Sequence, residues 1–205
     1  MTIRLHRGDL PDLSHYRTSA VAIDTETMGL QPHRDRLCVV QLSPGDGSAD
    51  VVQIPAGGHT ASNLANILSD PAILKVFHFA RFDLGALQNA LGVMAAPVYC
   101  TKIASRLART YTDRHGLKDL VRDLLGIDLT KQQQLSDWGA DALSDAQVAY
   151  AASDVLHLHA VRDKLDAMLA REGRTELAAA CFRFLPDRAR LDLAGWAAED
   201  IFAHS

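Results

Sequence analysis

The stretch AVAIDTET, Ala20 to Thr27, joins a short apolar run to two acidic residues. A run of this length is typical of a buried strand. Successive side chains of a strand point to opposite faces, so Asp24 and Glu26 are expected on the same face, close enough to repel each other. A bound cation or protons would relieve this repulsion, and so would a strand end that turns into solvent. The pair alone does not decide between these alternatives.

The segments around this stretch predict an α/β fold. Residues 19–24, 37–43, 50–54 and 73–79 are rich in Val, Ile and Leu and predict strands, the first three joined by connections short enough for antiparallel hairpins. Apolar residues at helical spacing predict helices over 61–68, 81–91, 101–109, 117–125 and, from a capping box at Ser144, 144–173. We therefore expect a mixed sheet of about five strands flanked by helices.

The composition is that of a globular protein. The chain has 205 residues, of which 48% are hydrophobic and 22% charged, so we expect one domain over 1–175 and a tail over 176–205. No apolar run approaches the roughly 20 residues that cross a bilayer, and the N-terminus lacks a signal-peptide core, so a cytoplasmic protein without membrane contact is expected. The net charge of −4 argues against a surface built for long nucleic acid, and three widely spaced cysteines predict reduced thiols.

Two further acids give the first pair more weight. Asp83 follows the predicted strand 73–79 at the start of a helix, where the helix dipole alone favours an acid. Asp154 lies among small and apolar residues of the last predicted helix, on the same face as Tyr150. A solvated or paired structural acid is the alternative at each position. The ordered set D-x-E, a later Asp and Y-x-x-x-D is far more specific than any of its parts.

This ordered set resembles the motifs of the ribonuclease D family, the 3′–5′ exonucleases that use four acids and a tyrosine. DTETMGL, VFHFARFDL, HGLKDL and QLSDWGADALSDAQVAYAASDV match the family in order over most of the chain. One departure is Asp141-Ala142-Leu143, where the family often has Arg-Pro-Leu. The resemblance implies a ribonuclease H-like fold, and Ala149 does not fit the sister class that has a catalytic histidine at that position.

Other segments resemble the nanoRNase C branch of this family, which degrades very short RNAs. They are PHRDRLCVVQL, CTKIASRLARTYTDRHGLKDL, KQQQLSDW and the C-terminal CFRFLPDRARLDLAGWAAEDIFAHS. This branch lacks the additional helical domains that ribonuclease D carries. The resemblance implies a homo-oligomer in the form of a closed ring, an octamer, in which neighbouring subunits wall off each active site.

Four carboxylates gathered at one strand are oxygen ligands suited to Mg²⁺ or Mn²⁺. Two such ions, about 3.5–4 Å apart, could hold an attacking water and a leaving 3′ oxygen on either side of a phosphate. An unperturbed tyrosine, with a pKa of about 10, is a poor general base, so Tyr150 is expected to orient the water. The predicted catalytic residues are Asp24, Glu26, Asp83, Tyr150 and Asp154, and the four acids are the predicted metal ligands.

The substrate contacts are predicted from weaker signals. A basic segment from Lys102 to Arg122 is a candidate phosphate-binding surface in a net acidic chain, although a solvated helix face is the usual meaning of such a segment. Leu30 follows the D-x-E strand, and in the family an apolar residue at this position can wedge between bases; a plain loop residue is the alternative. His78 lies in a predicted buried strand, where a histidine is more often a core residue than a ligand. The candidates for substrate binding are Leu30, His78, Arg106, Arg109, Arg114, His115 and Lys118.

The sequence thus predicts a metal-dependent 3′–5′ exoribonuclease acting on short RNA, dinucleotides above all. The alternatives are a broader 3′–5′ exonuclease that also takes DNA and a non-catalytic nucleic-acid-binding module. The tail is rich in aromatic and apolar residues, which predicts packing on its own domain or on a neighbouring subunit. Pro186 is expected to prevent the tail from forming a single helix.

Overall fold

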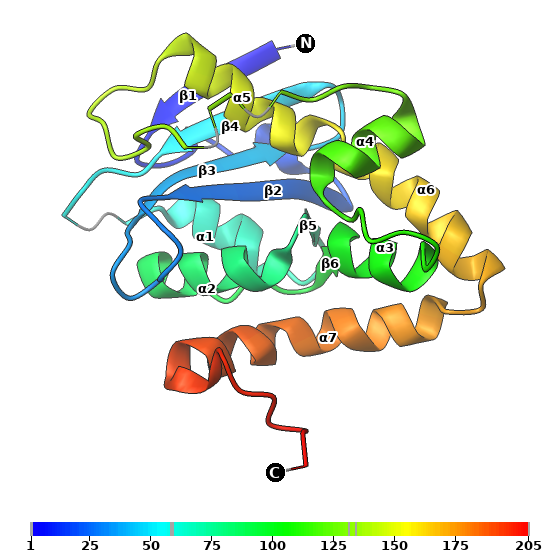
Figure 1. Cartoon of the computed structure of the whole chain (residues 1–205). Coiled ribbons are helices and arrows are strands. Elements are labelled where there is room, and N and C mark those ends of the chain that lie inside the picture. Colours follow the sequence, from blue (N-terminus) through cyan, green and yellow to red (C-terminus); the bar gives the residue numbers. More distant parts are fainter. Residues whose placement is uncertain (1, 58–59, 131, 134, 205) are drawn as a thin grey trace.

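The computed structural model describes residues 2–57, 60–130, 132–133 and 135–204, so Lys131 and Gln134 of the KQQQLSDW match lie outside the described residues. In the described part, six strands form one mixed sheet in the order β1-β4-β3-β2-β5-β6 (Figure 1). The strands are β1 (Thr2–Arg7), β2 (Ala20–Thr27), β3 (Leu37–Ser43), β4 (Ser48–Gln53), β5 (Leu74–Phe77) and β6 (Val98–Cys100).

The strand directions follow from the length of the connections. Strands β2, β3 and β4 pair antiparallel through short turns, as the hairpin prediction requires. Strands β5 and β6 join β2 in parallel, through crossovers that contain helix α1 (Ser62–Ser69) and helix α2 (Ala80–Leu91). The sheet has six strands instead of about five: β1, which pairs in parallel with β4, and the three-residue β6 were not predicted. Strand β2 therefore lies inside the sheet, with a neighbour on each side.

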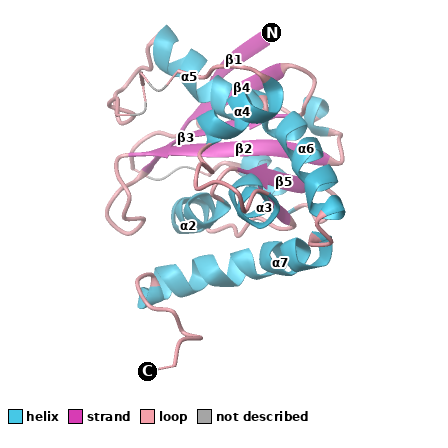
Figure 2. Cartoon of the chain, turned by 45° about the vertical axis from the view of Figure 1, so that its right-hand side comes forward, coloured by secondary structure: helices cyan, strands magenta, loops and turns pink. Residues whose placement is uncertain are grey.

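Helices cover the sheet (Figure 2), which confirms the predicted mixed sheet flanked by helices. Helix α5 contacts β1 to β4, while α2 contacts β2, β3, β5 and β6. None of the helices in the described part is long and apolar enough to span a membrane. The remaining helices are α3 (Thr101–Ala108), α4 (Leu117–Leu125), α5 (Asp145–Leu156), α6 (Leu158–Arg171) and α7 (Thr175–Leu191).

The prediction of a single helix over 144–173 is wrong. Helix α5 begins with the predicted capping box at Ser144, but the chain turns at His157, whose φ of −106° and ψ of −6° depart from the regular helix, and α6 follows. Helix α5 packs on the sheet, whereas α6 packs against α3 and α4. One straight helix could not reach both surfaces, so burial of Leu158 and its neighbours on α6 outweighs the continuous helical pattern.

Pro186 does not interrupt the helix, contrary to the expectation, because α7 continues through it; the tail is nevertheless not a single helix, since α7 ends at Leu191. A proline inside a helix removes one backbone hydrogen bond. Packing compensates here: Leu185 and Ala189, on either side of the proline, are buried, and α7 lies along α2 and contacts β6. Most of the tail is therefore a helix on its own domain, while Trp196 and Phe202 remain exposed near the C-terminus.

Candidate active site

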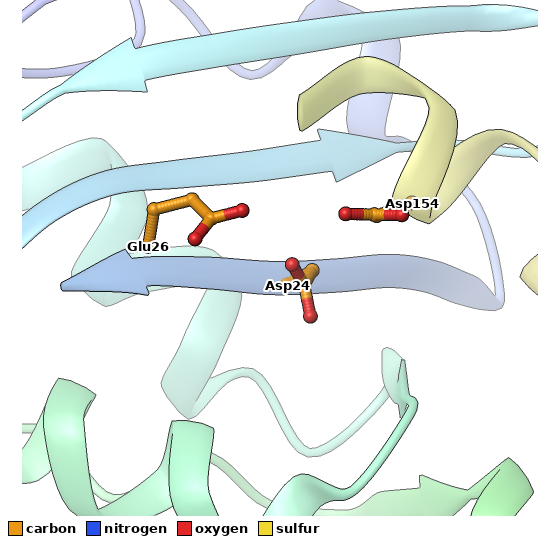
Figure 3. Close-up of side chains that lie close together, drawn as sticks. All are labelled: Asp24, Glu26 and Asp154. Atoms are coloured by element: carbon orange, nitrogen blue, oxygen red, sulfur yellow. The ribbon is translucent and has the colours of Figure 1, made fainter. Parts of the chain in front are cut away.

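Three carboxylates meet beside strand β2. Asp24 and Glu26 project from the same face of the strand, as the alternation of side chains requires. Asp154 reaches the same place from α5, and Figure 3 shows the three side chains directed into one space. Ligand oxygens of the three residues all lie within 4.8 Å of one another. Segments about 130 residues apart in the sequence thus supply one compact set of oxygen atoms.

The fourth acid, Asp83, joins the site from α2. Strand β5 ends at Phe77, and Phe79 begins α2 with a positive φ of 68°, which places Asp83 in the first turn of the helix. Thr25 donates a hydrogen bond from its hydroxyl to Asp83 Oδ1 over 2.6 Å. Asp83 lines a cavity of about 330 Å³ together with Asp24, Glu26, Asp154 and Tyr150, so all five predicted catalytic residues surround one space.

Burial raises the pKa values of all four acids, and the charges of neighbouring acids add to the rise at Asp24 and Glu26. Burial is the largest cause for each, and it raises the pKa of Glu26 to about 8, with further contributions from Asp154 and Asp83. Burial likewise raises the pKa values of Asp83 and Asp154 to about 7. The pKa of Asp24 is raised by burial and by the charges of Asp83, Asp154 and Glu26. Like charges gathered in a poorly solvated space favour protonation unless a cation replaces the protons.

The donor set fits a hard divalent cation. The four side chains offer only oxygen atoms, and in the described part of the chain none of them forms a salt bridge with a basic residue. His78 also lines the cavity, but its Nδ1 lies 2.9 Å from the hydroxyl of Thr101. Oxygen-only sites with uncompensated negative charge suit Mg²⁺ or Mn²⁺ rather than zinc.

Tyr150 is placed to act as a hydrogen-bond donor. Its ring is buried and packs against Trp138, with 6.0 Å between the ring centroids. Burial, and next the charge of Asp154, raise the pKa of the Tyr150 hydroxyl well above its usual value. The hydroxyl therefore stays protonated at neutral pH. A protonated hydroxyl can donate a hydrogen bond to a water molecule and is a poor base.

Gln41 supports the acids but is not apparent from the motifs. It lies on β3 directly opposite Asp24, is fully buried, and donates a hydrogen bond from Nε2 to Asp24 Oδ2 over 2.9 Å. A glutamine within the otherwise apolar CVVQL run is the only signal in the sequence. Its partner depends on the strand register, which the sequence does not reveal.

The structure places some candidate substrate-binding residues at the cavity. His78 and Lys118 line it, the latter from the first turn of α4. The pKa of His78 is lowered to about 3 by burial and by Lys102, so its imidazole is neutral. Leu30 lies outside this space, is 81% exposed, and lines a neighbouring cleft.

Other basic candidates do not line the cavity. Arg109 is buried and forms a salt bridge of 2.6 Å with Asp123, so its charge is already paired. His115 Nδ1 lies 2.8 Å from the hydroxyl of Ser105. The side chains of Arg106 and Arg114 are exposed. Lys102, the first residue of the predicted basic segment, does line the cavity.

Known proteins resemble this chain both in sequence and in structure. A family model described as 3′–5′ exonuclease matches residues 13–170. Ribonuclease D of Gluconacetobacter diazotrophicus is 39% identical over 173 residues, which are 84% of this chain and 44% of that protein. The chain thus spans less than half the length of that relative.

Two solved structures are similar over the full length of both chains. The structure of Brucella melitensis NrnC with bound Mg²⁺ is 61% identical with a TM-score of 0.97. The structure of Brucella melitensis NrnC bound to pGG is 62% identical with a TM-score of 0.98. These findings confirm the resemblance to the ribonuclease D family and its nanoRNase C branch, and with them the ribonuclease H-like fold.

Proposed function

The chain belongs to the 3′–5′ exonuclease family, and from this premise we propose that it is a cytoplasmic, metal-dependent 3′–5′ exoribonuclease for short RNA, dinucleotides above all. The observation that carries the proposal is the cluster of Asp24, Glu26 and Asp154, whose oxygens lie within 4.8 Å of one another without basic partners in the described residues. The similarity to NrnC structures with Mg²⁺ and with pGG supports both the metal and the substrate class.

Each residue of the site has a chemical role in this proposal. Asp24, Glu26, Asp83 and Asp154 hold the divalent cations, two in number. When bound, such cations polarise the phosphate and lower the pKa of water. Gln41 fixes one oxygen of Asp24, and Thr25 fixes one oxygen of Asp83. Tyr150 donates its hydroxyl proton in a hydrogen bond that orients the attacking water toward the phosphorus.

The preference for short RNA rests on charge. The chain has a formal net charge of −4, so release of counterions along a long strand contributes little affinity. Affinity must then come from one or two bases and from the terminal phosphate. Lys118 and Lys102 line the cavity and are the candidate cations for that phosphate, while Arg106 and Arg114 are exposed and remain further candidates.

Hydrolysis of labelled oligonucleotides tests the proposal. We expect purified protein with Mg²⁺ to shorten 5′-labelled RNA from its 3′ end, to act fastest on dinucleotides, and to be inactive in EDTA. A 5′-phosphorylated dinucleotide should bind more tightly than its dephosphorylated form. Equal rates on DNA would favour the broader exonuclease, and binding without hydrolysis would favour a non-catalytic module. Affinity that rises steadily up to twenty nucleotides would contradict the preference for short RNA.

The proposal includes assembly into a homo-oligomeric ring. Exposed apolar side chains cluster near the C-terminus, where the rings of Phe184 and Phe202 are in contact with 5.8 Å between their centroids. Such a set is typical of an interface between subunits. Light scattering should give a mass several times that of the 22.3 kDa chain, and Phe202→Ser should reduce it. A monomeric wild-type protein would exclude the ring.

A further inference from the structure

Residues 137–141, which we call the tryptophan loop, precede α5 and are held by side chains from other parts of the chain. The hydrogen bonds run from Gln147 Nε2 to the carbonyl of Asp137, from Arg36 Nη2 to that of Gly139 and from Gln53 Nε2 to that of Ala140, over 2.8 to 3.0 Å. The donors come from α5, from the connection before β3 and from the end of β4. Because the acceptors are backbone carbonyls, these bonds fix the path of the loop itself.

The tryptophan loop carries Trp138 against the ring of Tyr150. Trp138 is 3% exposed, and its ring centroid lies 6.0 Å from that of Tyr150, with 40° between the ring planes. Tilted aromatic pairs attract each other at this distance. Tyr150 lines the cavity of the four acids, whereas Trp138 is not among the described residues that line it. Trp138 therefore contacts the tyrosine rather than the space for substrate.

Tyr150 receives little support from its own helix. On a helix, the side chains three and four positions away are the neighbours of a ring. For Tyr150 these neighbours are small or polar: Ala146, Gln147, Ser153 and Asp154. Trp138 supplies a large aromatic partner from outside α5, and this contact limits the orientations open to the tyrosine ring.

The indole N–H of Trp138 plays no part in this contact. Its Nε1 is buried and has no hydrogen-bond acceptor among the described residues. A buried donor left unpaired destabilises a fold, and buried tryptophans usually find an acceptor. Stability alone would therefore favour a residue without this donor, so the role of Trp138 lies in its ring.

We propose that Trp138 is a positioning residue for hydrolysis: it holds the ring of Tyr150 so that the hydroxyl stays beside Asp154, and the tryptophan loop holds Trp138 in turn. The inference rests on the proposed function, in which that hydroxyl orients the attacking water. A ring that tilts about its Cα–Cβ bond moves its hydroxyl, the atom farthest from the backbone, by the largest distance. Misplacing a group by about 1 Å at a reacting centre can lower a rate by about a hundredfold.

A double-mutant cycle tests whether Trp138 acts through the tyrosine. Steady-state kinetics with Mg²⁺ and a 5′-phosphorylated RNA dinucleotide give kcat and KM for the wild type, Trp138→Leu, Tyr150→Phe and the double variant. We expect Trp138→Leu to lower kcat about tenfold at unchanged KM. With Tyr150→Phe present, the same change should cause almost no further loss, because the hydroxyl is already gone. Trp138→Phe keeps an aromatic ring without the unpaired N–H and should restore most of the turnover.

Phe182 offers a matched control. It is buried, and its ring centroid lies 4.5 Å from that of Tyr99, which is not among the described residues that line the cavity. Phe182→Leu removes the same kind of contact, so it should lower the melting temperature as Trp138→Leu does and leave kcat unchanged. Mn²⁺ affinity, measured by electron paramagnetic resonance without substrate, should be equal in Trp138→Leu and the wild type, since none of the four acids lies in the tryptophan loop.

If Trp138→Leu does not fold, Gln53→Met removes one hydrogen bond to the loop at similar side-chain volume. It should lower kcat about threefold, again only while the Tyr150 hydroxyl is present.

Additive losses in the cycle, a raised KM at constant kcat, or wild-type turnover by folded Trp138→Leu would overturn the inference. Weaker Mn²⁺ binding by Trp138→Leu would also overturn it, because Trp138 would then support the whole site. A wild-type protein that cuts no RNA would overturn the proposed function as well, and the wild type alone reveals that outcome.

Discussion

Two carboxylate sites of the same sheet, Asp50 on β4 and the acids of β2, differ in their partners. At one edge, Asp50 of β4 accepts hydrogen bonds from Arg4, His6 and Tyr16, over 2.6 to 2.8 Å. Burial alone would raise the pKa of Asp50, but the hydrogen bonds from Arg4, Tyr16 and His6 outweigh it and hold the pKa at about 2. Near the centre, burial raises the pKa values of the β2 acids because no cation opposes it.

The difference separates structural acids from functional ones. Asp50 is buried, whereas Asp24, Glu26 and Asp154 are half-buried, so deeper burial does not mark the functional acids. What differs is whether the fold itself supplies the compensating charge. The charge of Asp50 on β4 is balanced by Arg4 of the neighbouring strand β1. In the described part of the chain the acids of β2 have no such basic partner, so a cation from outside the chain would have to balance their charge.

The largest expected effect is on activity. Asp154→Asn and Asp83→Asn should each reduce hydrolysis in Mg²⁺ by several orders of magnitude while the circular dichroism spectrum stays native, because each change removes a cation ligand and no packing. Asp50→Asn is the matched change at the other site and should leave the rate near that of the wild type. Near-normal turnover by either Asp83→Asn or Asp154→Asn would refute the distinction between structural and functional acids.

The next largest effect is on stability, and we expect it at Asp50 rather than at the acids of the candidate active site. Asp50→Asn leaves the half-buried Arg4 and the buried Tyr16 without their carboxylate acceptor, so unfolding in urea should show a loss of about 3 kcal/mol. The pKa of Asp50 is depressed in the folded state, so this stabilisation is complete above pH 4 and is lost as the pH falls toward 2. A loss below about 1 kcal/mol would mean that the network contributes little.

Tyr150→Phe should produce a smaller change in turnover. It removes the hydroxyl that orients water and keeps the ring that packs on Trp138, so kcat should fall about tenfold or more while KM changes little. Steady-state kinetics on a dinucleotide measures both values. An increase in KM at constant kcat would assign Tyr150 to substrate binding instead.

The smallest effect concerns stability without metal. The pKa of Glu26 is about 8 in the folded chain and near 4.5 when unfolded, so the folded state binds more protons between these values and loses stability as the pH rises from 5 to 8. Glu26→Gln should therefore stabilise the metal-free protein at pH 8, by about 1 kcal/mol after allowance for solvent screening, and not at pH 5. Mg²⁺ should raise the melting temperature of the wild type more than that of this variant. Identical melting curves at both pH values would refute the prediction.

The sequence predicted which acids gather at the site better than it predicted the residues and segments around them. The four acids and Tyr150, which line one cavity, could be predicted to lie together because the spacings D-x-E and Y-x-x-x-D are local and the order of the motifs resembles that of the family. Their catalytic roles stay a prediction. Gln41 was missed because its contact with Asp24 depends on strand register, which the sequence does not reveal. The turn at His157 and the continuity of α7 through Pro186 were mispredicted for the same reason: tertiary packing overrides local pattern.

The position of β2 inside the sheet has a consequence for how the enzyme can lose its site. Strands with neighbours on both sides open last, so the amides of Asp24 and Glu26 should exchange their hydrogens only through global unfolding. Residues 192–197, at the C-terminal end of α7, should exchange much sooner. The chain would then keep Asp24 and Glu26 in place through every partial opening that begins at its C-terminal end.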